Sequence, residues 1–251
     1  MNGELRSRER SPIRRIAVGL GLLTVAAATA TGCLRPPVPL PGPPPGPQPS
    51  RVAVYGDSLL NSSTSRWRWE ILASLPGWGT LERTEWGTAP CDHRDQMEAD
   101  ARLGWKVRVA VIAFYGNQAT PCTAGRDVET LYRADLSWAV EFWSSRGVPV
   151  VLVVPPGPVG DEPLSAGARA ALAVAEEHGL EPVDLTDAFV DPVTGRFSRE
   201  LDGEVVRATD GIHLCEPEEP EPTTCPADAP GVVRFADPIA GAAVEEARRT
   251  K

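Results

Sequence analysis

The stretch RVAVYGDSLLNSS, residues 51–63, joins an apolar run to a polar one through Gly-Asp-Ser. Its first six residues are mostly apolar and β-branched, which predicts a buried β-strand. Ser58 comes directly after this strand, so it is either a turn residue or a nucleophile at a strand end. Gly-Asp-Ser turns are common, and the choice therefore depends on what the rest of the chain brings near Ser58.

Further apolar runs predict a parallel sheet. The strand candidates after 51–56 are 107–114 and 148–154, with weaker ones at 80–86 and 181–185. Helical patterns occur at 66–75, 126–146 and 165–178, and a last helix is expected from about Pro238 to Arg249. Strands that are apolar on both faces and alternate with helices indicate an α/β domain whose sheet is covered on both sides.

Residues 1–33 have the pattern of an export signal. Five arginines precede the apolar segment 16–30. This segment is shorter than a typical transmembrane helix and has the length of the apolar region of a secretory signal. The segment ends in small residues followed by Cys33, which resembles the lipobox of bacterial lipoproteins, where the cysteine is acylated. The alternative is an ordinary cleavage site. We expect an exported protein, lipid-anchored on the outer face of the cell membrane or secreted.

Residues 34–50 contain nine prolines and cannot bury a core. Such a segment is typical of a semi-rigid polyproline spacer, which would span about 50 Å when fully extended. A linker without a tuned length is the alternative. Residues 51–251 remain, which is enough for one domain with a substantial core.

The charge of the chain limits its partners. Without the signal, 20 basic residues face 32 acidic ones. This acidity disfavours nucleic acid and anionic lipid surfaces as partners. We expect contact with the membrane only through the lipid anchor. We also predict a monomeric protein with neither a cofactor nor a metal.

Four cysteines follow Cys33, namely Cys91, Cys122, Cys215 and Cys225. An even number behind an export signal predicts disulfides. Of the three possible pairings we favour Cys91–Cys122 with Cys215–Cys225, because the second closes a short loop rich in Glu and Pro. A zinc site of Cys91, His93 and Cys122 is the alternative, although its spacing matches no structural zinc pattern.

A serine nucleophile needs a base, usually histidine, and the chain has three. His178 precedes a glycine at a predicted helix end, where a structural role is expected. His93 lies on a polar loop, as a surface or binding residue. His213 follows Asp210 by three residues in DGIHL, so Asp210 can fix the imidazole tautomer while the other ring nitrogen faces Ser58. A solvated Asp-Gly turn beside a histidine is the competing interpretation.

Acyl transfer also needs hydrogen-bond donors for the developing oxyanion. Asn117 in FYGNQ offers a side-chain amide, Gly87 in EWGTAPC offers a backbone N–H, and the Ser58 N–H is a third donor. Ser58, Gly87 and Asn117 each follow a predicted strand. Ligands bind beyond the carboxyl ends of parallel strands, so these three residues are expected at one site.

The motif YGDSL, a glycine after the second strand, an asparagine after the third and D-x-x-H near the end together resemble the SGNH (GDSL) hydrolase family. The resemblance covers residues 51 to about 245 and implies a flavodoxin-like three-layer α/β/α sandwich. It implies that Ser58 is the nucleophile, His213 the base and Asp210 its orienting carboxylate. It also implies that Gly87 and Asn117 join Ser58 as oxyanion donors.

Two features depart from the family pattern. The family usually shows G-x-N-D in the third block, whereas here Gly116 directly precedes Asn117 and Gln118 follows it. The family motif that contains the glycine after the second strand is barely recognisable here. Gly79 is the other candidate for this glycine, but it fits less well than Gly87 because it lies before the strand. With these assignments, a bond between Cys91 and Cys122 would tie together the two donor loops, and the other disulfide would brace the loop after His213.

These residues together predict an extracytoplasmic serine esterase that removes short acyl groups, such as acetyl, from cell-envelope glycans or small esters. Trp86, beside Gly87, is a candidate sugar platform, although tryptophans more often belong to the core. An O-acyltransferase that uses the same residues is one alternative, and a catalytically idle binding lipoprotein is the other.

Overall fold

The computed structural model describes residues 43–160, 165–216 and 224–250. The predicted signal peptide, the lipidation candidate Cys33 and spacer residues 34–42 lie outside these ranges. The rest of the spacer, residues 43–50, contains neither helix nor strand and leads directly into the first strand. All described residues belong to the compact unit Leu40–Lys251.

Five parallel strands form the central sheet, in the order β2-β1-β3-β4-β5. They are β1 (Arg51–Gly56), β2 (Gly79–Thr84), β3 (Val107–Ala113), β4 (Val150–Val154) and β5 (Val183–Asp184). Each strand begins or ends within a few residues of its predicted position. The α/β class with a parallel sheet is confirmed, and the strand order is that of flavodoxin-like folds.

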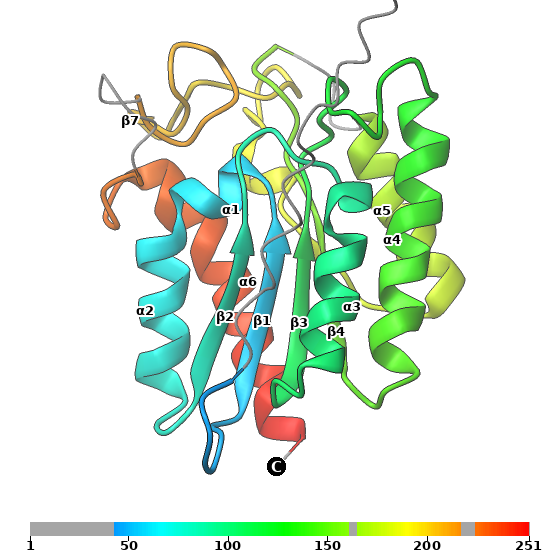
Figure 1. Ribbon diagram of the computed structural model, residues 1–251. Coiled ribbons are helices and arrows are strands. Elements are labelled where there is room, and N and C mark those ends of the chain that lie inside the picture. Colours follow the sequence, from blue (N-terminus) through cyan, green and yellow to red (C-terminus); the bar gives the residue numbers. More distant parts are fainter. Residues whose placement is uncertain (1–42, 161–164, 217–223, 251) are drawn as a thin grey trace, which may run out of the picture. The chain divides into compact units, whose positions relative to one another are not determined.

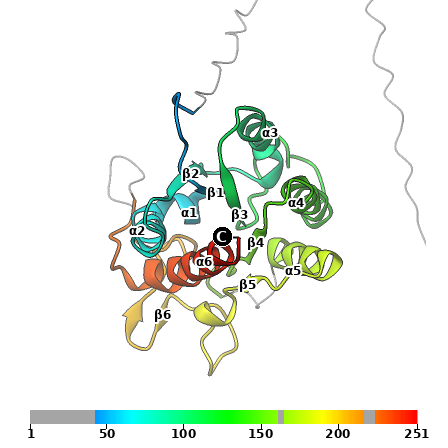
Figure 2. The same ribbon diagram turned by 90° about the horizontal axis from the view of Figure 1, so that it is seen from below.

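Helices cover both faces of the sheet, as Figures 1 and 2 show. The helices α2 (Thr64–Ser74) and α6 (Pro230–Arg249) lie on one face, and α3 (Arg94–Arg102), α4 (Val128–Ser144) and α5 (Ala166–His178) on the other. Side chains alternate between the two layers along a strand: Val52 and Val54 pack in one core, Ala53 and Tyr55 in the other. Every residue of β1 after Arg51 is therefore buried, which explains the unbroken apolar run.

The predicted start of the last helix is wrong. Helix α6 begins at Pro230 and contains Pro238 in its interior. An interior proline costs roughly 3 kcal/mol because it removes one hydrogen bond and crowds the preceding turn. Buried residues lie on both sides of it, including Phe235 before and Ile239 after, and their packing on the sheet outweighs that cost.

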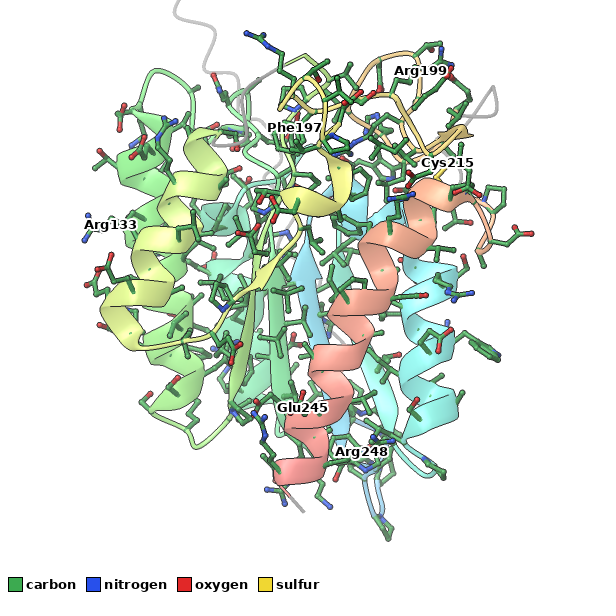
Figure 3. All side chains as sticks on the ribbon, turned by 180° about the vertical axis from the view of Figure 1, so that it is seen from behind. Arg133, Phe197, Arg199, Cys215, Glu245 and Arg248 are labelled. Carbon is green, nitrogen blue, oxygen red and sulfur yellow. A yellow bond between two sulfur atoms is a disulfide. The ribbon has the colours of Figure 1, made fainter. Side chains whose placement is uncertain are left out.

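Short elements occupy the carboxyl end of the sheet. They include α1 (Ser58–Ser62), the 3-10 turns η1 (Pro90–His93) and η2 (Asp187–Phe189), and the antiparallel pair β6 (Glu200–Leu201) and β7 (Glu204–Val205). Figure 3 shows Phe197 and Cys215 at this end, while Glu245 and Arg248 lie at the opposite end. Among the described residues, none of the helices combines the length and apolarity that a membrane crossing requires.

Candidate active site

Ser58 lies at the junction of β1 and α1. Gly56 has to be glycine here, because a Cβ would lie 2.4 Å from the carbonyl oxygen of Ala113 on the neighbouring strand. Asp57 then caps α1, with its carboxylate accepting the Leu59 N–H at 3.2 Å. Ser58 is the first residue of α1 and is only 7% exposed. The Gly-Asp-Ser sequence thus turns the chain sharply from strand to helix and holds the serine at the strand end.

The side chains of Ser58, His213 and Asp210 form one hydrogen-bonded chain. His213 Nε2 lies 3.2 Å from Ser58 Oγ, and Nδ1 lies 2.5 Å from Asp210 Oδ2. A carboxylate can only accept a hydrogen bond, so Nδ1 carries the ring proton. Nε2 is then unprotonated and accepts a hydrogen bond from the Ser58 hydroxyl. The structure thus brings together the three residues predicted as nucleophile, base and orienting group.

The loop that carries His213 is fixed by its own backbone. Asp210 Oδ1 accepts the N–H groups of Ile212 at 2.8 Å and His213 at 2.9 Å. Burial alone would raise the pKa of Asp210, but hydrogen bonds from the His213 side chain and from these two N–H groups outweigh it and hold the pKa below its usual value. Asp210 is therefore a carboxylate at neutral pH, which is the form that can orient the imidazole.

A buried arginine, Arg207, holds the loop that carries His213 through hydrogen bonds to backbone carbonyl groups. Arg207 is fully buried, and its guanidinium donates to the carbonyl oxygens of Ile212 and Gly157. It also lies over the Phe189 ring, with Cζ 4.3 Å from the ring centre. Desolvation lowers the pKa of Arg207 to about 10, which still leaves it charged at neutral pH. This role could not be predicted from the sequence, because Arg207 belongs to no motif.

The oxyanion-donor candidates lie on the loops after β2 and β3. Asn117 Nδ2 donates to the Thr88 carbonyl at 2.8 Å and makes a longer contact of 3.3 Å with Asp57 Oδ2. Gly87 is exposed with φ at +69°, a conformation that favours glycine, and among the described residues its N–H has no acceptor. Gly79 pairs with Arg51 at the start of β1, so it lies at the other end of the sheet from Ser58.

Asp57 connects these loops and was not assigned a role from the sequence. Besides capping α1, its carboxylate accepts the Tyr115 N–H at 2.5 Å and the Asn117 amide. Desolvation raises the pKa of Asp57 to about 7, although the hydrogen bonds from Tyr115 and Leu59 act in the opposite direction. A signal was present in the sequence, since a carboxylate between a buried strand and a nucleophile has to find donors.

His93 was predicted to be either a surface or a binding residue, and the first of these alternatives is wrong. It is 2% exposed, and its ring nitrogens contact Gln96 Oε1 at 2.9 Å and Thr88 Oγ1 at 3.0 Å. Its ring also meets the edge of Phe114, and burial lowers its pKa. His93 is the last residue of η1, and α3, which was not predicted, follows it directly; these two elements bury its ring. His178 ends α5 and contacts Ser137 Oγ at 2.7 Å, which agrees with a structural role.

Both favoured disulfides are present, Cys91–Cys122 and Cys215–Cys225. The first joins the loop of Gly87 to the loop of Asn117. The sulfur atoms of Cys91 and Cys122 are bonded to each other, so they offer no thiolates to the zinc site considered as an alternative. The second begins two residues after His213, and the Cys225 N–H donates to the Ser62 carbonyl at 2.7 Å. It therefore links the His213 loop to the end of the helix that begins with Ser58.

No protein-family model and no curated protein sequence matches the chain. Solved structures do. A lipase/acylhydrolase from Enterococcus faecalis superimposes with a TM-score of 0.56 at 19% identity, covering 80% of this chain and 97% of the other. A GDSL-like lipase from Bacteroides thetaiotaomicron gives 0.55 at 16% identity, covering 78% and 88%. The chain has the SGNH hydrolase fold.

An acetyl xylan esterase is a further SGNH-fold neighbour, with a TM-score of 0.54 at 13% identity and coverage of 76% of this chain and 98% of that one. The coverage shows that the similarity extends over nearly the whole neighbouring chains and is not limited to the sheet. At these identities the likeness concerns the fold, so the chemistry of this SGNH-fold chain has to be argued from its own residues.

Proposed function

We propose that the protein is an extracytoplasmic serine esterase that removes short acyl groups through an acyl-enzyme on Ser58. The observation that carries the proposal is the continuous chain from Ser58 Oγ through both nitrogens of His213 to Asp210. Nucleophile, base and orienting carboxylate in hydrogen-bond reach of one another are what activates a serine. Two of the structural neighbours are named a lipase/acylhydrolase and an acetyl xylan esterase, which supports acyl hydrolysis as the general type of reaction.

In the proposed reaction, Ser58 Oγ attacks the ester carbonyl carbon while its proton moves to His213 Nε2. Asp210 stabilises the resulting imidazolium. The tetrahedral intermediate then expels the alcohol, which takes the proton from His213, and leaves the acyl group on Ser58. Water attacks the acyl-enzyme in the same way and gives a proton to His213, which returns it to Ser58 Oγ as the acid is released.

The negative oxygen of the intermediate would bind to the N–H groups of Ser58 and Gly87 and to the Asn117 amide. Within the described part of the chain the Gly87 N–H has no acceptor, so it can donate to this oxygen. For Asn117, the long contact with Asp57 is the one that the oxyanion would replace, while the shorter bond to Thr88 holds the amide in place. Removing one such donor typically costs about 2.7–4 kcal/mol of transition-state stabilisation.

The substrate class that we propose is an acylated glycan of the cell envelope or a small ester. A short acyl ester of an envelope glycan fits an exported domain held away from its anchor by the spacer. One SGNH-fold neighbour is named an acetyl xylan esterase, which is in keeping with an acetylated glycan. The two disulfides support an oxidising compartment outside the cytoplasm. Lipidation of Cys33 stays part of this proposal.

The test measures hydrolysis of aryl esters of increasing acyl length by the purified, oxidised protein. We expect the highest kcat/KM with acetyl esters and a loss of about 10³-fold or more in Ser58→Ala and in His213→Ala. The matched controls are Ser144→Ala, at an exposed serine, and His178→Ala at the far end of α5. Undiminished turnover in Ser58→Ala would overturn the proposal.

A further inference from the structure

The indole ring of Trp86 lies against the imidazole of His213. Their ring centres are 4.9 Å apart and their planes are inclined by 39°. Trp86 follows β2 and is half-buried. The three-residue chain of Ser58, His213 and Asp210 is complete without this contact, so the proposed reaction does not by itself explain it.

The indole is held in place by Asn61. Trp86 Nε1–H donates to Asn61 Oδ1 at 2.8 Å, and Asn61 Nδ2 donates to the Thr84 carbonyl at 3.0 Å and lies 3.2 Å from Thr84 Oγ1. The orientation of the Asn61 amide is fixed by its partners, because an indole N–H can only donate and a carbonyl can only accept.

Asn61 lies one turn after Ser58 on α1, so the contacts close a ring. Ser58 bonds His213, the His213 ring contacts the inclined ring of Trp86, Trp86 bonds Asn61, and Asn61 belongs to the same helix as Ser58. Segments from α1, the loop after β2 and the loop before α6 thereby fix one another. A ring of this kind holds its members more rigidly than any single contact would.

The two hydrogen bonds of His213 leave one motion of its ring undetermined. Asp210 and Ser58 bind opposite ring nitrogens in the ring plane, and the imidazole can still tilt about the line that joins these nitrogens. The Trp86 indole, packed against the imidazole at an inclination of 39°, opposes this tilt. In addition, an aromatic face attracts a cation, and His213 becomes a cation when it takes the serine proton.

We propose that Trp86 is a positioning residue for the acyl-transfer reaction, which sets the tilt of the His213 imidazole and stabilises the imidazolium formed in the transition state. The inference rests on the proposed function, because it assigns His213 as the base. It differs from the sugar platform predicted for Trp86 from the sequence. A platform binds the substrate and lowers KM, whereas a residue that acts through the base raises kcat.

The test compares Trp86→Leu and Trp86→Phe with Trp69→Leu, which alters a tryptophan on α2 that is 62% exposed. We expect Trp86→Leu to lower kcat about 3- to 30-fold, the range that a cation–π contact provides, with KM changed less than twofold. Trp86→Phe restores an aromatic face and should recover most of kcat. Trp69→Leu should match the wild-type protein.

A second readout does not depend on turnover. In ¹³C-histidine-labelled protein, the indole ring current displaces the ring-proton resonances of His213, and this displacement should disappear in Trp86→Leu and partly return in Trp86→Phe. Unchanged resonances of His93 and His178 report an intact fold. Unmoved His213 resonances, or a raised KM with unchanged kcat, would overturn the inference.

The outcomes also separate this inference from the proposed function. If Ser58→Ala abolishes turnover and Trp86→Leu leaves kcat unchanged, the hydrolase assignment stands and the role of Trp86 is rejected. If the wild-type protein turns over no ester, the proposed function fails and the catalytic role of Trp86 fails with it, even where the resonances show the ring contact.

Discussion

His213 Nε2 lies 3.2 Å from Ser58 Oγ, although 155 residues separate the two along the chain. Ser58 is placed by the end of β1, and His213 by a loop that the Cys215–Cys225 disulfide and Arg207 hold against the same end of the sheet. The contact therefore depends on the fold as a whole. Four measurements examine what surrounds it.

Asp210→Asn should lower kcat about 10²- to 10⁴-fold. The asparagine amide would donate to His213 Nδ1 and so place the ring proton on Nε2, where the imidazole can no longer accept from Ser58. Kinetics on an aryl acetate measure the loss. Asp187→Asn, at an exposed aspartate, is the control and should retain wild-type kcat. If the kcat of Asp210→Asn were within threefold of the wild-type kcat, control of the imidazole tautomer by Asp210 would be unimportant.

Asn117→Ala should lower kcat about 10²- to 10³-fold with little change in KM, because the donor acts on charge that develops in the transition state. Gln118→Ala removes the exposed amide next in the chain and should have no such effect. Equal kinetics for the two variants would mean that Asn117 serves the loop structure alone, through its bond to Thr88.

Asp57→Asn should alter how stability depends on pH. The folded-state pKa of Asp57, about 7, exceeds the ordinary value of 3.8, so the folded protein keeps a proton that the unfolded chain releases between these values. The wild-type free energy of unfolding therefore falls as pH rises through this range, by as much as about 4 kcal/mol from this group. The variant lacks this contribution and should gain stability relative to wild type.

Urea unfolding of both proteins near pH 4.5 and near pH 7.5 measures the effect. Any constant cost of the asparagine cancels when the difference between variant and wild type is compared at the two pH values. We expect the free energy of unfolding of Asp57→Asn, relative to that of the wild-type protein, to be higher near pH 7.5 than near pH 4.5. A difference that is the same at both pH values would contradict the buried, proton-holding state of Asp57.

Removing either disulfide should reduce activity under conditions where the domain is still folded. Cys91 and Cys122 are 31 residues apart and Cys215 and Cys225 are 10 apart, so loop-closure entropy predicts losses of about 4 and about 3 kcal/mol respectively. Paired Cys→Ser variants, compared by circular dichroism and ester kinetics at one temperature, test this. Full activity in a folded variant without Cys91 and Cys122 would show that the donor loops need no covalent tie.

Much of the fold followed from local patterns. Buried parallel strands are apolar on both faces, so β1, β3 and β4 could be predicted from the sequence alone. Pro238 misled the prediction of α6, because a local breaker was overridden by burial of the residues around it. Helix α3 was missed because its sequence, RDQMEADAR, is strongly polar and buries few side chains.

For the candidate site, the sequence determined which residue types follow which strands: Ser58 after β1, Gly87 after β2, Asn117 after β3 and His213 near the end. Because the strands run parallel, their carboxyl ends lie at one edge of the sheet, so the proximity of Ser58, Gly87 and Asn117 could be inferred. Only the tertiary structure decided that Trp86 faces His213, that Arg207 lies beneath the loop, and that Asp57 and Thr88 hold Asn117. Those contacts join segments with no shared periodicity, and they form only when the loops pack together.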